Sequence, residues 1–185
     1  MVGQDWLKYL KFRCTGCGNC CRNTLVCVTD ADVRRIAERT GKSPLAVVRF
    51  YSHDEVSMSE SDPLWVKFTH RKRVMGLRSL GDHCIFLDNH TNRCTIYDSR
   101  PVTCRDHPFN VTLSDTGAVE KISLSRIVPC PHAWDGKISR KSLRATQAWN
   151  ERQEESYLEK VREWNRMNSG SRTRRAFLRF LGFNV

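Results

Sequence analysis

The feature that most constrains this chain is its cysteine content: nine cysteines stand in two blocks, with a long cysteine-free stretch between them. The first block holds Cys14, Cys17, Cys20, Cys21 and Cys27, and the second holds Cys84, Cys94, Cys104 and Cys130. A chain of 185 residues can bury a core without disulfide bonds, and its N-terminus shows no apolar stretch of the kind that directs export. Clustered thiols in a reducing compartment indicate metal or redox chemistry. We therefore expect a cytoplasmic, metal-binding protein.

Composition and charge suggest how the chain is divided. Hydrophobic residues make up 39% and charged residues 28%, which supplies a core and excludes a wholly disordered chain. No apolar run reaches the roughly 20 residues that a membrane-spanning helix needs, so we expect no transmembrane segment. Of the net charge of +11, +7 falls in residues 137–185, where 12 Lys and Arg face 5 Asp and Glu. We expect a metal-binding domain at 1–136 and an amphipathic helix with a basic tail at 137–185.

Helix signals open the stretch between the two blocks. Thr29 can cap a helix, with Asp32 three residues on as in a capping box, and Gly41 suits the C-terminal stop. Pro44 then starts a second short helix, which leaves apolar residues up to Phe50 available for packing.

The second block lies among strand and turn signals. Alternating apolar residues predict strands at 66–68 and 74–77, and hairpins that pair 84–87 with 94–97 and 111–113 with 119–124. On the first hairpin, Cys84 and Cys94 can approach one another across the turn. Between the hairpins, residues 99–101 start a short helix that carries Cys104.

The C-terminal quarter reads as helix. Apolar residues from Trp149 to Trp164 recur every three or four positions, which predicts an amphipathic helix over 140–168. The polar run 168–171 ends it, and the basic tail that follows can dock its phenylalanines on the core or lie on a membrane surface. Together these signals predict an α+β fold: short helices around one or two small antiparallel hairpins, a metal centre at their junction, and the long helix and tail outside.

The first block, FRCTGCGNCC, contains two overlapping C-x-x-C steps. Such a step lets two thiolates reach one ion from a tight turn, and Gly16 and Gly18 give the backbone the freedom that this turn needs. Three thiolates at this spacing match the first ligands of the bacterial ferredoxin run C-x2-C-x2-C-x3-C-P. The fourth position of that run is Thr24, so a further ligand must come from the second block, where Cys130 precedes Pro131.

The ordered combination of FRCTGCGNCC, CIFLDNHTNRCTIYDSRPVTCRDHPF and CP resembles the CxxCxxCC cysteine-cluster family, described as a zinc- or iron-chelating domain. The matching stretch runs from about Phe12 to Pro131. Cys27 falls outside the pattern, and we interpret it as a buried or free thiol. The resemblance implies that the metal-site residues are Cys14, Cys17, Cys20, Cys21, Cys84, Cys94, Cys104 and Cys130.

The resemblance also implies an iron–sulfur cluster, most simply [4Fe–4S], as in proteins described as iron–sulfur oxidoreductases; the flagellin lysine N-methylase carries a similar cysteine pattern. Eight thiols are compatible with three metal contents: one [4Fe–4S] cluster, two zinc ions, or a mixed site. The ferredoxin-like spacing and the Cys130-Pro131 step favour iron–sulfur over zinc, whose usual arrangement is two C-x-x-C pairs.

Three functions are compatible with these metal contents. The first is a cluster-bearing protein with redox or protein-modifying activity on an unidentified protein or small-molecule partner. The second is a zinc-stabilised binding module that contacts nucleic acid or an acidic protein partner through its basic tail. Transient metal handling is a third. We find no G-x-G-x-x-G run, no radical-SAM spacing C-x3-C-x2-C and no Ser-His-Asp arrangement that would name catalytic residues.

Cations and histidines near the thiols are the remaining candidates. We name Arg100 and Arg105 as cofactor-binding residues, and expect them to act by hydrogen-bonding carbonyls or closing salt bridges around the cluster loops. For His83 and His107, packing is favoured over metal ligation. Nearby cations lower the pKa of a thiol and so favour a thiolate site. Four arginines directly adjoin a cysteine and support this interpretation: Arg13, Arg22, Arg93 and Arg105.

Overall fold

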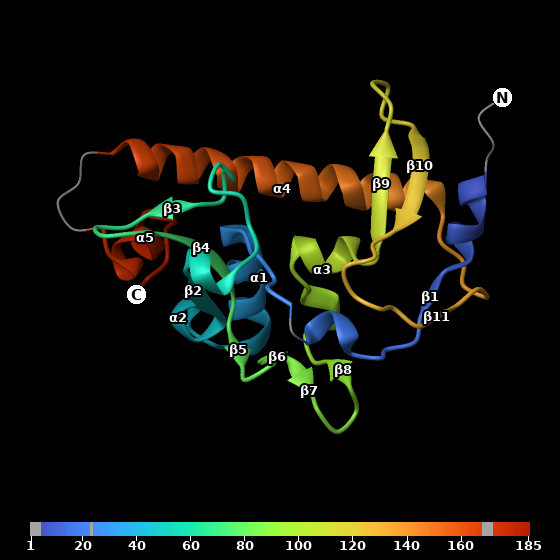
Figure 1. Cartoon of the computed structure of the whole chain (residues 1–185), viewed down its shortest axis with the longest axis horizontal. Coiled ribbons are helices and arrows are strands. Elements are labelled where there is room, and N and C mark those ends of the chain that lie inside the picture. Colours follow the sequence, from blue (N-terminus) through green and yellow to red (C-terminus); the bar gives the residue numbers. More distant parts are fainter. Residues whose placement is uncertain (1–4, 23, 168–171) are drawn as a thin grey trace.

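In the computed structural model, which describes residues 5–22, 24–167 and 172–185, one long helix runs along the molecule. This helix is α4 (Arg140–Arg166), at the top of Figure 1. Its C-terminal part covers a hydrophobic half (24–77, 154–167 and 172–185), and its N-terminal part lies beside a cysteine half (5–22 and 79–147). Helices and short antiparallel strands both contribute, so the predicted α+β class is confirmed. Among the described residues, no helix is both long and apolar enough to cross a membrane.

The hydrophobic half begins with α1 (Asp30–Thr40), whose predicted capping box and stop are confirmed. The Thr29 hydroxyl accepts a hydrogen bond from Asp32 N, and the Asp32 carboxylate accepts one from Thr29 N. Gly41 ends the helix with a left-handed φ of 67°. A cap of this kind stabilises a helix by about 1 kcal/mol.

The second predicted helix is a single turn, α2 (Pro44–Val47), and the chain continues as β2 (Val48–Tyr51). The apolar residues after Val47 pack from this strand rather than from a helix, since β-branched and aromatic side chains suit an extended backbone. β2 pairs antiparallel with β4 (Lys72–Leu77), which also pairs with β3 (Val66–Lys67). The result is a three-stranded sheet in the order β2-β4-β3.

The larger hydrophobic cluster packs around this sheet, α1, α4 and α5 (Arg174–Phe180), and it also includes Phe86 and Ile96 from the cysteine half. The tail therefore docks its phenylalanines on the core, one of the two placements considered from the sequence. The polar break at 168–171 lies outside the described residues. Because the cluster draws on both 1–136 and 137–185, a division into two domains there stays a prediction. Members with no solvent exposure include Val33, Ile36, Val47, Val66, Val161, Phe177 and Leu178.

In the hydrophobic half, the short 3-10 helix η3 (His53–Glu55) follows β2.

The cysteine half is built from shorter elements. Cys104 stands on the predicted short helix, and the predicted hairpin around 115–117 is present. The elements of this half, besides the start of α4, are η1 (Asp5–Lys11), β1 (Arg13–Cys14), η2 (Asn19–Cys21), β5 (Ser79–Leu80), β6 (His83–Cys84), β7 (Leu87–Asp88), β8 (Arg93–Cys94), η4 (Tyr97–Ser99), α3 (Val102–Asp106), β9 (Phe109–Leu113), β10 (Val119–Leu124) and β11 (His132–Ala133).

The first predicted hairpin differs from expectation in its pairing. β7 and β8 pair over two positions, with Leu87 opposite Cys94. Cys84 lies instead in β6, opposite Ser79 of β5. Gly81, with a left-handed φ of 62°, reverses the chain just before Cys84 and creates this extra strand pair. The two cysteines therefore reach the same region from neighbouring hairpins rather than across one turn.

Candidate metal centre

The first cysteine block forms a tight loop that ends in η2. Gly16 and Gly18 adopt left-handed φ values of 71° and 75°, as the predicted turn requires. Gly18 also lies against the second block, because a Cβ at this position would come within 2.9 Å of the Asn92 carbonyl oxygen. The loop thus brings the first block directly against the turn between β7 and β8.

The Cys-Pro segment is tied to the same loop. β1 pairs with β11, which follows that segment in the chain. The Thr15 hydroxyl donates to the Pro131 carbonyl at 2.7 Å, and the Asn19 side-chain amide donates to the Pro129 carbonyl at 3.0 Å. These contacts place Cys130 beside the first block, although the two lie far apart in the sequence.

Arg22 holds the β7–β8 turn against the first block. Its guanidinium donates to the side-chain oxygen of Asn92 at 2.8 Å and to that of Asn89 at 3.2 Å. Its backbone forms a β-bridge with His83, whose ring nitrogens contact Asp82 at 2.9 Å and Asn89 at 3.0 Å. Both nitrogens of His83 therefore have partners other than a metal, in line with the packing role favoured for it.

Arg100 and Arg105 bind carbonyl oxygens of the loop that carries Cys104. Arg100 Nε donates to the Tyr97 carbonyl at 2.7 Å. Arg105 donates from Nε to the Arg100 carbonyl at 3.0 Å and from Nη2 to the Asp98 carbonyl at 2.9 Å. Both arginines thus make the carbonyl contacts that we expected of them.

The same loop is anchored to the hydrophobic half through Asp32. The fully buried Asp32 carboxylate accepts hydrogen bonds from Val102 N at 3.1 Å and from Arg35 Nη2 at 2.6 Å. Arg35 also donates to the Arg100 carbonyl at 2.8 Å. The sequence marked Asp32 only as a capping residue, since its partner Val102 lies 70 residues further along the chain.

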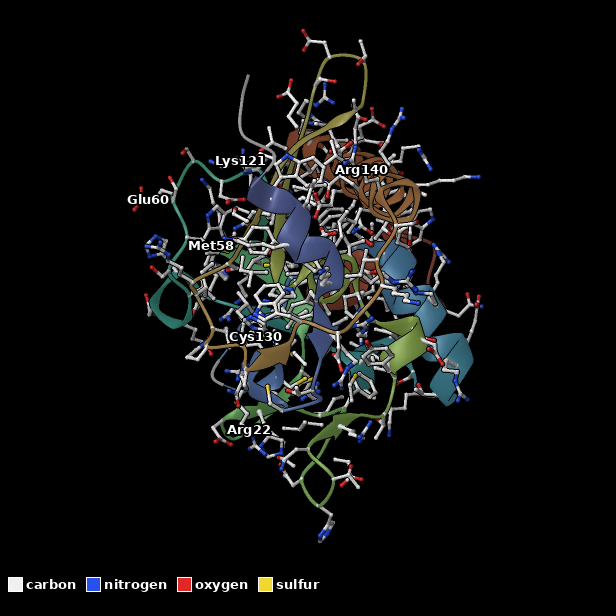
Figure 2. The ribbon with its side chains drawn as sticks, turned by 90° about the vertical axis from the view of Figure 1, so that its right-hand side faces the viewer. Arg22, Met58, Glu60, Lys121, Cys130 and Arg140 are labelled. Atoms are coloured by element: carbon white, nitrogen blue, oxygen red, sulfur yellow. The ribbon has the colours of Figure 1, made fainter. Side chains whose placement is uncertain are left out.

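These contacts bring seven of the eight pattern cysteines to the wall of one cavity of about 700 Å³. Figure 2 views the molecule from this side, with a group of sulfur atoms between the labelled Cys130 and Arg22. Cys84, half-buried in β6, is not part of the wall. The cysteines in the wall are Cys14, Cys17, Cys20, Cys21, Cys94, Cys104 and Cys130.

The rest of the wall includes Arg100, Arg105 and His107, which we named from the sequence, and residues of α4 that the sequence patterns did not mark. His107 contributes a half-buried ring, and burial lowers its pKa. The first turns of α4 face the cavity because its apolar stripe, which packs on the core, starts further along the helix. The apolar and α4 members of the wall include Phe12, Phe109, Val111, Ile138, Ser142, Leu143, Thr146 and Gln147.

The Cys21 thiol lies between two other cysteines and hydrogen-bonds with both. Its proton lowers the pKa of Cys20 and of Cys94, and the pKa of Cys21 itself is raised. The positive charge of Arg100 lowers the pKa of Cys20 and Cys94 further. Arg100 is thus the arginine whose charge favours the thiolate form, which is the form that binds metals.

The thiols separate into two groups that meet at Cys20. Burial, together with the charges of the first-block thiols, raises the pKa of Cys130 to about 11. Burial, together with the charges of Cys94 and Cys20, raises the pKa of Cys84 to about 11, and similar causes raise that of Cys104. Cys20 thus acts on thiols of both sets. For reference we name Cys14, Cys17, Cys20 and Cys130 the first thiol group, and Cys21, Cys84, Cys94 and Cys104 the second.

A wall of thiols suits either a zinc ion or an iron–sulfur cluster, since cysteine sulfur binds both. Four sulfurs bound to one zinc ion, each about 2.3 Å from it, must all face a single point. Within the described residues, no three Cys, His, Asp or Glu side chains converge closely enough to hold one ion, whereas seven cysteines surround an open volume. The donor set is thus one of thiols around a shared volume, and it is compatible with either kind of metal centre.

Cys27, which falls outside the pattern, also lies outside the cavity wall. Its backbone forms a β-bridge with Gly76, and its carbonyl accepts a hydrogen bond from Thr103 at 3.1 Å. Burial raises the pKa of its thiol to about 11. It is a half-buried thiol packed against the sheet, as we interpreted it, and it offers a matched control for substitutions of the other eight.

Comparison with known proteins gives two matches. The family model CxxCxxCC, described as "Putative zinc- or iron-chelating domain", matches residues 13–156, which include all eight pattern cysteines. Among curated proteins, Uncharacterized protein MJ0661 of Methanocaldococcus jannaschii is 29% identical over 106 residues, which cover 57% of this chain and 49% of the relative. The chain thus spans about half the length of that relative. No solved structure gives a significant match.

Proposed function

The chain belongs to the CxxCxxCC family of zinc- or iron-chelating domains, and on this premise we propose that it binds a [4Fe–4S] cluster and transfers electrons. The observation that carries the proposal is the cavity of about 700 Å³ with seven pattern cysteines in its wall. A single zinc ion needs one point of convergence, whereas a cluster of iron and sulfide atoms needs a volume lined by thiolates.

We assign the cluster to the first thiol group, Cys14, Cys17, Cys20 and Cys130. The assignment is supported by the ferredoxin-like spacing of the first three and by the proline that follows the fourth. It is also supported by the hydrogen bonds that hold the Cys130 segment against the first block. The second group is then left for a structural role, either as buried thiols or as a zinc site beside the cluster.

When bound, a cluster of this kind exchanges one electron at a time, at a potential set by nearby charge and solvent access. Arg100 supplies positive charge next to the thiolates, and Arg105 holds the carbonyl of Arg100 in place. The rings of Phe12 and Phe109, whose centroids are 5.0 Å apart, add apolar surface to the wall and would limit water there. These residues would tune the potential, while an unidentified protein or small molecule exchanges the electron.

The direct test is anaerobic purification of the full chain, followed by metal analysis, sulfide analysis and an optical spectrum. We expect a brown protein with about four iron and about four acid-labile sulfide atoms per chain, as the [4Fe–4S] composition requires. A colourless protein that carries stoichiometric zinc and no sulfide would overturn the cluster.

Serine variants test the choice of ligands. Cys17→Ser and Cys130→Ser should each lose most of the iron and sulfide, because each removes one thiolate of the proposed set. Cys27→Ser is the matched control and should keep both. Full iron occupancy in Cys17→Ser and Cys130→Ser, with loss in Cys84→Ser, would move the cluster to the second group.

The second candidate function is a zinc-stabilised binding module. It is supported by the mutual proximity of the second group, in which the Cys21 thiol hydrogen-bonds with Cys94 and the charges of Cys84 and Cys94 act on Cys104. In this case the metal only holds the cysteine half together, and the function belongs to the protein surface. Zinc without sulfide, in a protein with no reversible reduction, would favour this function over electron transfer.

A further inference from the structure

Five arginines gather in a groove at the opposite end of α4 from the cysteine cavity. The groove has a volume of about 770 Å³ and lies between the β3–β4 turn and the start of α5, at the left of Figure 1. Among the described residues, none of those that line it is acidic. Its cationic members are Arg71, Arg73, Arg172, Arg174 and Arg175, with His70 beside them.

Hydrogen bonds fix the two sides of this arginine groove relative to one another. Thr69 N donates to the Arg172 carbonyl at 3.3 Å, and Arg172 N donates to the Thr69 hydroxyl at 3.1 Å. The turn is closed by a bond from Phe68 N to the Arg71 carbonyl at 2.9 Å. Phe68 in turn packs edge-on against the buried Phe177 of α5, with ring centroids 6.2 Å apart. The arginines therefore project from a braced surface of the hydrophobic half.

The positive charges of the groove are poorly compensated. Arg73 is mostly buried, and its ion-pair partner Glu55 stands 3.9 Å away. Burial lowers the pKa of Arg73, and the charges of Arg174 and Arg71 lower it further. Within the described part of the chain, Arg71, Arg174 and Arg175 form no ion pair. Like charges held together without carboxylates repel one another, and an anion between them would relieve that repulsion.

From this geometry we propose that the arginine groove binds the phosphate backbone of a nucleic acid. Arg73 and Arg172 also donate to the carbonyls of Phe50 and Met167, whereas Arg71, Arg174 and Arg175 are exposed. Each planar guanidinium can bind two phosphate oxygens at once, and these three around one open volume match a run of neighbouring phosphates. The net charge of +11 attracts such a polyanion over longer distances. The site goes beyond the proposed metal chemistry and does not depend on it, because the groove is formed by the hydrophobic half.

The packing of α5 argues against a membrane surface as the partner. Phe177, Leu178, Leu181 and Phe183 are all buried in the core. The tail therefore presents arginines without an apolar face that could enter a lipid layer. A phosphodiester chain, in contrast, carries one negative charge per nucleotide at regular spacing, which suits cations fixed on rigid elements.

The test is fluorescence anisotropy of the full-length protein with two probes, a labelled single-stranded RNA and a labelled DNA duplex of mixed sequence. Affinity should fall as salt rises from about 50 mM to about 200 mM, with a log–log slope of about 0.7 to 0.9 for each phosphate contact. The triple variant Arg71→Ala/Arg174→Ala/Arg175→Ala should weaken binding by about tenfold or more and reduce that slope by about 2 to 3.

A matched control removes the same charge elsewhere. Arg39→Ala/Arg126→Ala/Arg152→Ala replaces three exposed arginines outside the groove and should keep most of the affinity. All six positions are exposed, so both variants should keep the melting temperature of the wild type. The single variant Arg71→Gln, in a turn, should lower the salt slope by about 1 and gives a second readout of the same site.

Equal losses of affinity in the two triple variants would overturn the proposal, because binding would then follow total charge rather than the groove. Failure to bind either nucleic acid at low salt would also overturn it. So would stronger competition by polyglutamate, or by vesicles of anionic lipid, than by unlabelled nucleic acid, since the preferred ligand would then be an acidic protein or a membrane.

Discussion

The two halves of the molecule are held together by different physical means. The hydrophobic half has a three-stranded sheet and a cluster whose central side chains are fully excluded from solvent. The cysteine half has one longer hairpin, β9–β10, and otherwise relies on three pairs of two-residue strands, β1–β11, β5–β6 and β7–β8. Seven of its cysteines face a cavity. Each buried aliphatic or aromatic side chain contributes about 1.5–3 kcal/mol, so the first half can fold by apolar burial. The second half needs a further source of stability, and thiolate–metal bonds can supply it.

The comparison also explains why α4 is so long. Its C-terminal part buries Tyr157, Val161 and Trp164 in the core, while its N-terminal part lines the cavity with polar residues such as Thr146. Asp32 then joins α1 to the loop that carries Cys104. We therefore expect the hydrophobic half to keep its fold when the metal is removed.

Metal removal is the change to which the two halves should respond most differently. Structural metal binding contributes up to about 10–16 kcal/mol in small domains, so chelation should raise amide exchange in β1, β7, β8 and α3 by well over about tenfold. Amides of α1 and β4 should keep their protection, because their hydrogen bonds lie on the apolar core. Hydrogen-exchange mass spectrometry of loaded and metal-free protein measures both. Equal loss in the two halves would show that they fold as one unit and would contradict the comparison.

The junction between the halves is tested by Asp32→Asn. The change removes a buried negative charge that binds Arg35 and Val102 N, which should lower the free energy of unfolding by about 3–5 kcal/mol. It should also lower the metal content of the folded protein, since the loop with Cys104 loses its anchor. Urea denaturation and metal analysis on the same samples give the two quantities.

Asp30→Asn is the control for this junction. Asp30 is also buried on α1, but its partner Lys160, at 2.6 Å, lies within the hydrophobic half. This variant should lose stability and keep its metal. If the two variants lose metal to the same extent, the link through Asp32 has no special part in the site.

A cavity in the apolar core should lower the stability of the hydrophobic half. Ile36→Ala empties a fully buried position and should lower the free energy of unfolding by about 2–5 kcal/mol. Leu80→Ala, at a side chain 66% exposed, should change it by less than about 0.5 kcal/mol. The metal content per folded chain should stay unchanged in both, and metal release below the unfolding transition of Ile36→Ala would argue against separate supports.

The smallest expected effects come from alanine substitutions at two glycines with similar backbone angles, one in each half. Gly41→Ala meets no atom within 4 Å and should cost only about 1–2 kcal/mol for its left-handed φ. Gly18→Ala has a similar φ but would also place a Cβ 2.9 Å from the Asn92 carbonyl, so it should cost more and weaken metal binding. Thermal unfolding and metal titration compare them, and equal effects would mean that the two cysteine blocks do not depend on their close approach.

The halves also differ in how much of them could be predicted from the sequence. The capping box of α1 and the apolar stripe of α4 depend on residues a few positions apart, and both were found. The pairing of Cys84 with Ser79 and the bond from Val102 to Asp32 depend on contacts between separate segments, for which periodicity carries no signal. The meeting of the two cysteine blocks could be predicted only from ligand chemistry. The first block lacks a cysteine at the fourth position of the ferredoxin run, so a further thiolate had to come from the second block.

The measurement that tests the central claim most directly is X-ray absorption at the metal edge of the anaerobically purified protein. If thiolates of the cavity hold the metal, the first coordination shell should consist of sulfur at about 2.3 Å, with a second shell of iron for a cluster. A first shell dominated by nitrogen or oxygen at about 2.0–2.2 Å would contradict thiolate ligation and, with it, the account of how the cysteine half is held together.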